Sequence, residues 1–130
     1  MPNPESIILR IVANCTSDSS REISLGSSVT PGNYAALCAN QILVTAANTG
    51  LDPDLMMAYA AAHEIGHLLM GRAHRDAGIM RAIWERNDIR AMAKLELCFS
   101  KEEKLAMRRY LLAAGASSAV LAESSPQGRR

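Results

Sequence analysis

Residues 52–71 read DPDLMMAYAAAHEIGHLLMG, and this stretch predicts the helix around which the rest of the chain folds. Asp52 is an N-cap residue followed by proline at the first helical position, and Asp54 adds negative charge to the first turn. Gly71 supplies a C-terminal stop, so the helix is expected over Pro53–Met70. Apolar side chains occupy almost every face of it, which predicts a helix that runs through the core.

The same stretch carries two of the three histidines of the chain, and the third follows in the run HEIGHLLMGRAH at residues 63–74. His63 and His67 are four residues apart, so on a helix their imidazoles lie on one face and can bind the same ion. Glu64 is rotated from His63 by about 100° around the helix axis. This position suits a general base acting on an ion-bound water better than it suits a further ligand.

A catalytic zinc site needs a third protein ligand and one open position. Gly71 lets the chain leave the helix and turn back, and His74 follows three residues later, which makes it the expected third ligand. A carboxylate further along the chain, from Glu85 or Glu96, is the rival for this role. With Zn²⁺ in place, the pKa of its water would fall toward about 7, and the hydroxide left after Glu64 removes a proton could attack a carbonyl group.

The run from His63 to His74, followed by Gly78-Ile79-Met80, resembles the motif of the metzincin clan of zinc peptidases, in which HExxHxxGxxH precedes a methionine-containing turn. The resemblance implies the following site: zinc ligands His63, His67 and His74, catalytic base Glu64 and turn methionine Met80. It also implies an α+β fold with a short, mostly parallel, twisted sheet and two long helices, the second carrying the motif, and a helical C-terminal part. A peptide or protein substrate would add to the sheet edge as a strand, for which Tyr34–Cys38 is the candidate.

This chain differs from the metzincin pattern in spacing and in length. Gly71 and His74 lie eight and eleven residues after His63, one more than in the clan motif, whereas the Gly-x-x-His spacing is kept. Ala82 stands where some members have a tyrosine ligand, so no such ligand is expected. Only 62 residues precede His63, so the first strand–helix unit of the family is expected to be shortened, lost or located upstream of the sequence as written.

The remaining elements are predicted from composition and turn signals. Strands are expected over Ser6–Ala13 and Tyr34–Cys38, and helices over Ala39–Asn48, Asn87–Lys94 and Lys101–Ala114, the last with a capping box formed by Ser100 and Glu103. Loops are expected over Asn14–Thr30, with a short extended piece at Glu22–Leu25, and over Arg72–Arg81. We expect one metzincin-like domain over residues 1–114 and a flexible tail over residues 115–130.

Charge and hydropathy narrow the classes of partner. The net charge of +1 argues against a nucleic acid bound through its phosphates, and the cluster Arg72, Arg75 and Arg81 is expected to form a solvated rim around the motif. No apolar stretch is long enough to span a membrane, and the first residues do not form a signal peptide. The sequence leaves the oligomeric state open.

The three cysteines are far apart and form no CxxC pair. Cys15, Cys38 and Cys98 are therefore expected to be small buried apolar groups in a cytoplasmic protein. One disulfide in a secreted protein is the alternative.

The function expected from these observations is that of a zinc metalloendopeptidase, a hydrolase acting on peptide bonds with one catalytic Zn²⁺. A second hypothesis is a catalytically inactive zinc-binding module or regulator on the same fold. A third is a helical domain in which the motif is coincidental.

Overall fold

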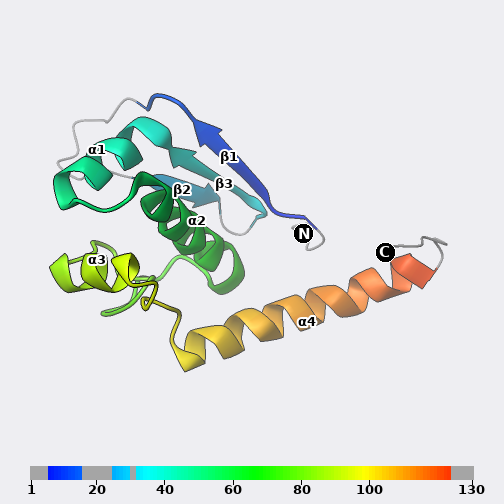
Figure 1. Cartoon of the computed structure of the whole chain (residues 1–130). Coiled ribbons are helices and arrows are strands. Elements are labelled where there is room, and N and C mark those ends of the chain that lie inside the picture. Colours follow the sequence, from blue (N-terminus) through cyan, green and yellow to red (C-terminus); the bar gives the residue numbers. More distant parts are fainter. Residues whose placement is uncertain (1–5, 16–24, 30–31, 124–130) are drawn as a thin grey trace.

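The structure, a computed structural model, describes residues 6–15, 25–29 and 32–123, and within them three strands precede four helices (Figure 1). The strands are β1 (Ile8–Val12), β2 (Gly26–Val29) and β3 (Tyr34–Cys38). The helices are α1 (Ala39–Thr49), α2 (Pro53–Met70), α3 (Arg86–Ala93) and α4 (Lys101–Glu123). The described chain is therefore α+β, with a small sheet and the motif on its second helix.

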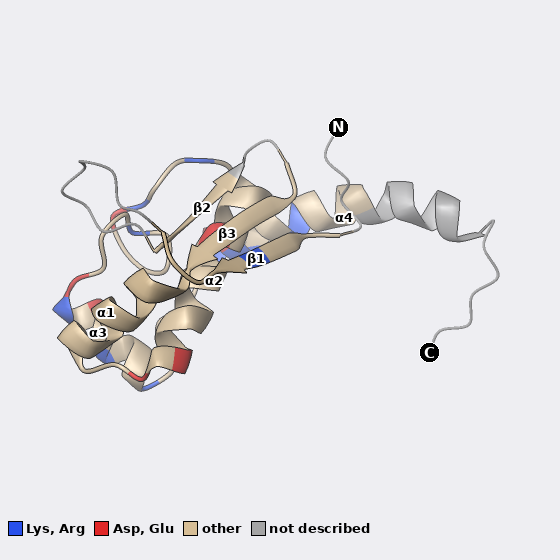
Figure 2. Cartoon of the chain, turned by 90° about the horizontal axis from the view of Figure 1, so that it is seen from above, with Lys and Arg blue, Asp and Glu red and all other residues tan. Residues whose placement is uncertain are grey.

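The sheet has the strand order β1-β3-β2, with β1 parallel and β2 antiparallel to β3. Tyr34 is paired with Ile8 on one side and with Val29 on the other, so β3 is the central strand. The prediction that Tyr34–Cys38 forms the substrate-binding edge is therefore wrong, because both sides of its backbone already pair within the sheet. The edge nearest the motif is β2, which packs against α2. Figure 2 shows that the sheet carries almost no charge; Arg10 is the charged residue in its strands.

Helix α2 begins and ends where the sequence predicts and packs against β2, β3 and the other three helices. The side chain of Asp52 caps its first turn by accepting a hydrogen bond from the backbone N–H of Asp54 at 2.7 Å. The core gathers around α2 and consists of aliphatic and methionine side chains, namely Leu37, Ile42, Ala46, Leu51, Met56, Ala60 and Met92. Burial of these side chains, which removes apolar surface from water, fixes α2 beneath β2 and β3.

Strand β2 and the end of α4 differ from the prediction. Residues 26–29 were expected in a loop because GSSV is small and polar; they become a strand through antiparallel pairing with β3, a long-range contact that local composition does not encode. Of the extended piece expected at Glu22–Leu25, only Leu25 is described. Helix α4 continues nine residues beyond Ala114, because the segment after it is rich in alanine and contains no proline before Pro126. In the described part of the chain, no helix has the length and hydropathy to cross a membrane.

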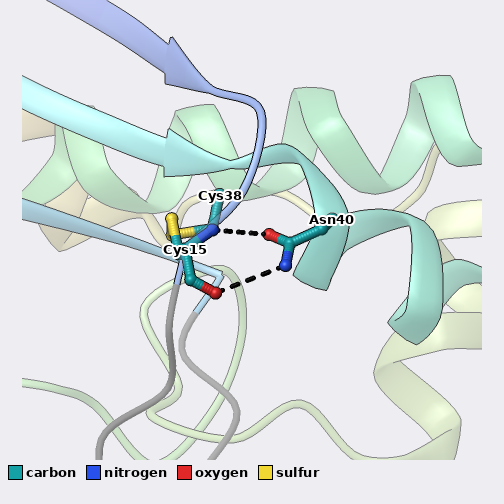
Figure 3. Close-up of a disulfide and its surroundings, with 3 residues drawn as sticks. All are labelled: Cys15, Cys38 and Asn40. Atoms are coloured by element: carbon teal, nitrogen blue, oxygen red, sulfur yellow. Dashed lines mark hydrogen bonds between the residues drawn. A yellow bond between two sulfur atoms is a disulfide. The ribbon is translucent and has the colours of Figure 1, made fainter.

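The cysteines also differ from the prediction. Cys15 and Cys38 form a disulfide, with their Cα atoms 5.7 Å apart (Figure 3). Cys98 is exposed. The parallel register explains the pair: Val12 lies opposite Cys38, so the chain leaving β1 passes beside the end of β3. Asn40 holds this turn from the start of α1, because its side chain accepts from the N–H of Cys15 at 3.1 Å and donates to the carbonyl of Cys15 at 3.3 Å.

Candidate metal centre

The last two turns of α2 place three functional side chains in the interior. His63, Glu64 and His67 are 9%, 8% and 7% exposed, respectively, although polar residues of these types are usually at the surface. The helix then ends at Gly71, which has φ of +105°, a region that side chains with a Cβ rarely adopt. This turn redirects the chain, so that His74 approaches the two buried histidines from outside the helix.

The three histidines converge through their Nε2 atoms. The Nε2 of His67 lies 3.1 Å from that of His63 and 3.2 Å from that of His74. Among the described acidic, histidine and cysteine side chains, these three form the group that could hold a metal ion, with ligand atoms within 4.8 Å of one another. Neither Glu85 nor Glu96, the rival carboxylates, belongs to this group. The structure therefore brings together the three ligands expected from the sequence.

Hydrogen bonds from the opposite ring nitrogens set the tautomers of two of these histidines. The Nδ1 atom of His63 lies 2.7 Å from the carbonyl oxygen of Ile79, and that of His67 lies 2.9 Å from the carbonyl oxygen of Gly71. Because a carbonyl oxygen only accepts, each Nδ1 carries a hydrogen and each Nε2 of the neutral ring presents a lone pair. Burial lowers the pKa of His63 and nearby His67 lowers it further, against an opposing hydrogen bond to Ile79, which favours the neutral ring.

Lone pairs that face each other repel unless a cation or proton lies between them. Tetrahedral zinc binds imidazole nitrogens at about 2.0–2.1 Å, which places two such nitrogens about 3.3 Å apart. The separations of 3.1 and 3.2 Å from the Nε2 of His67 are close to that value, and all three ligand atoms lie within 4.8 Å of one another. The donor set, which consists of imidazoles alone, is suited to a transition-metal ion and not to calcium or magnesium, which prefer oxygen ligands.

Glu64 is held between α2 and the edge strand β2. Burial raises the pKa of its carboxyl group, and electrostatic interactions with His67 and His74 and a hydrogen bond with Ser28 oppose that rise. β2 passes so close that a Cβ on Gly26 would lie 3.1 Å from the Cγ of Glu64. The carboxylate is thus next to the histidines and is covered on one side by β2, a strand that was not predicted from the sequence.

Met80 packs against α2 and is 1% exposed. Its sulfur packs against Gly66, one helical turn from His63, so closely that a Cβ at position 66 would be 2.5 Å from it. The preceding residue, Ile79, uses its carbonyl twice, accepting from His63 and from the indole N–H of Trp84 at 3.0 Å. The rings of Trp84 and His63 meet edge to face with centroids 5.8 Å apart. The role of the Ile79 carbonyl could not be predicted from the sequence, because a backbone carbonyl leaves no signal in the residue type.

A pocket of about 720 Å³ opens beside the three histidines and Glu64. It is lined by Leu25, by Gly26, Ser27 and Ser28 of β2, by Thr45, Asn48 and Thr49 of α1, and by Ile83 and Trp84 of the segment after Met80. Its size is in the range of ligand-binding clefts. The three histidines that could hold a metal ion therefore face a space that a substrate could enter.

The expectation that the three arginines near the motif form a solvated rim is only partly correct. Arg72 is exposed and lines the pocket. Arg81, by contrast, is 26% exposed and pairs with Asp88, its Nε lying 2.8 Å from Oδ2. Arg75 is half exposed and lies 3.7 Å from the buried carboxylate of Glu103. Two of the three arginines thus pair with buried carboxylates of neighbouring helices.

Comparison of the chain with models of known protein families, with curated proteins and with solved structures found no match. The resemblance to metzincins therefore rests on the local sequence motif.

Proposed function

We propose that this protein is a zinc-dependent metallopeptidase built on a compact metzincin-like fold. The observation that carries the proposal is the convergence of three imidazole Nε2 atoms, two of which are fixed as acceptors by carbonyl groups behind them. Structural zinc sites have four protein ligands, whereas catalytic sites have three and keep one position open. Three histidines next to a pocket correspond to the catalytic kind.

Zinc held by His63, His67 and His74 would supply Lewis acidity toward a substrate carbonyl and would make water in the pocket more acidic. The chain's own contribution comes from Glu64. Its raised pKa makes the carboxylate a stronger base than that of an exposed glutamate, so it can take a proton from the attacking water. Once protonated, the same carboxyl group can donate that proton to the amine that leaves as the peptide bond breaks.

The substrate is best accommodated along β2. This strand pairs with β3 on one side, lines the pocket and contacts Glu64 through Gly26 and Ser28. A peptide in extended conformation can hydrogen-bond to the edge of a sheet as an additional strand, which would bring its backbone beside the carboxylate. The role that the resemblance assigned to Tyr34–Cys38 therefore passes to Gly26–Val29.

The disulfide supports the alternative that the protein is secreted. Disulfides persist in secreted or periplasmic proteins and are rare in the reducing cytosol. The Cys15–Cys38 pair therefore favours a protein that works in an oxidising compartment over the cytoplasmic location expected from the sequence.

Metal analysis and a peptide-library assay test the proposal together. Purified protein is expected to contain one zinc per chain, and wild type is expected to cleave library peptides whereas Glu64→Gln retains zinc and does not. Glu102→Gln, which alters an exposed carboxylate on α4, serves as the matched control and should cleave as wild type does. Zinc without cleavage by wild type would favour an inactive zinc-binding module, and protein without zinc would favour the coincidental motif.

A further inference from the structure

Two buried carboxylates lie next to the candidate metal centre but outside it. Asp88 is 6% exposed and Glu103 is 2% exposed. Each closes a capping box at the start of a helix: Asp88 accepts from the N–H of Glu85 at 2.7 Å, and Glu103 accepts from the N–H of Ser100 at 2.7 Å. Capping boxes stabilise helix starts at the protein surface without burial of the carboxylate, so capping alone does not explain why these two are buried.

The burial is explained by a second partner, because each carboxylate also faces an arginine. Arg81 approaches Asp88 with Nε 2.8 Å from Oδ2, and Arg75 approaches Glu103 with Nε 3.7 Å from Oε2. The oxygen of Glu103 that faces Arg75 is buried and accepts no hydrogen bond. Since a buried charge is costly unless paired, the arginine is the main compensation for that oxygen.

The two arginines are the ends of one loop. Arg75 and Arg81 form an isolated β-bridge, supported by a hydrogen bond from the N–H of Arg75 to the carbonyl of Met80 at 2.9 Å. The segment between them carries Ile79, which accepts from His63, and Met80, which packs against Gly66 of α2. His74 is the residue directly before Arg75. Helix α4 therefore pairs with the start of the loop that follows the third histidine, and helix α3 pairs with its end.

From this geometry we infer that Asp88 and Glu103 are positioning residues for the metal centre. Through Arg81 and Arg75 they hold the 75–81 loop so that His74 reaches the pair on α2. The inference rests on the proposed function only in taking the bound ion to be zinc. His74 is exposed and comes from outside the helix, so its direction depends on this loop, whereas His63 and His67 are directed by α2 itself.

Zinc affinity measured by competition with a chromophoric chelator tests the inference without any need for enzymatic activity. Glu103→Gln and Asp88→Asn keep an oxygen that can cap the helix but remove the charge that holds the arginine. Each is expected to weaken zinc binding by about tenfold, the lower end of the effect of losing an outer-shell partner. Glu102→Gln and Asp54→Asn, which alter exposed carboxylates in the first turns of α4 and α2, should leave the affinity unchanged.

A variant cycle separates positioning from general loss of stability. Arg75→Gln should reproduce the effect of Glu103→Gln, and the two changes together should weaken zinc binding no more than either alone. In a His74→Ala background, Glu103→Gln should have no further effect, because the ligand that it positions is gone. An equal loss in that background would overturn the inference, as would tenfold weaker binding by Glu102→Gln. If wild type binds zinc and Asp88→Asn, Glu103→Gln and Arg75→Gln all bind it with unchanged affinity, the inference is refuted and the proposed function stands. If wild type binds no zinc, both are refuted.

Discussion

Replacing Gly66 with alanine tests whether Met80 is fixed against α2. A Cβ at position 66 would lie 2.5 Å from the sulfur of Met80, 3.2 Å from its methyl carbon and 3.3 Å from the methyl carbon of Met70. Non-bonded carbon atoms prefer separations of about 3.5–4.0 Å, so Met80 would have to move. Met80 is 1% exposed and its loop is held at both ends, which leaves the side chain little room to do so.

Two opposing effects set the magnitude. Alanine is favoured over glycine in a helix by about 1 kcal/mol, and overpacking of a filled core costs about 1–3 kcal/mol. Gly66→Ala is therefore expected to lower the free energy of unfolding by about 1 kcal/mol in total. In a Met80→Ala background the obstacle is gone, so the same change should raise the free energy of unfolding by about 1 kcal/mol.

Urea unfolding of the wild type, both single variants and the double variant, all without metal, measures this reversal of sign. The coupling between the two positions should be about 2 kcal/mol, within the range found for residues in contact. If Gly66→Ala stabilised the wild type as much as the Met80→Ala variant, Met80 would not be held against α2, and the account of the loop given above would be refuted.

Three further predictions concern the metal, the pH dependence and the disulfide. His67→Ala should abolish stoichiometric zinc, measured by elemental analysis, and should remove the rise in melting temperature that zinc gives to wild type, because metal binding couples to folding. Burial raises the pKa of Glu64, so in the metal-free protein the free energy of unfolding should fall as pH rises from the ordinary pKa of this group through the raised one. Urea unfolding of wild type between pH 4 and 8 should show this fall, and Glu64→Gln should remove it. The same pH profile in both proteins would contradict the prediction. Replacing Cys15 and Cys38 with serine opens a loop with a sequence separation of 23 and should lower the free energy of unfolding by about 3 kcal/mol, whereas Cys98→Ser should have little effect in the same assay.

The part of the site on α2 could be predicted because it depends on local rules. Capping, the glycine stop and the helical period fix Pro53–Met70, and the i, i+4 spacing then places His63 and His67 on one face. His74 could be predicted as a partner because it follows the helix-ending glycine. The distance between His74 and the two histidines on α2 could not be predicted, because it depends on a loop held by residues of α3 and α4.

The features that were missed depend on long-range contacts. β2 is a strand because β3 lies beside it, and the Cys15–Cys38 disulfide forms because β1 and β3 are parallel and in register. Neither pairing leaves a pattern in the segment itself, where GSSV has the composition of a loop. The metzincin-like fold and the peptidase activity remain predictions, which the experiments above address.

The edge-to-face contact between Trp84 and His63 gives the protein an intrinsic optical probe. Trp84 is the one tryptophan in the sequence, so all indole emission comes from a ring whose N–H shares the Ile79 carbonyl with that histidine. Loading of an ion at His63 should change the brightness or wavelength of that emission, so occupancy could be followed in real time on unlabelled protein, including variants that have lost all turnover.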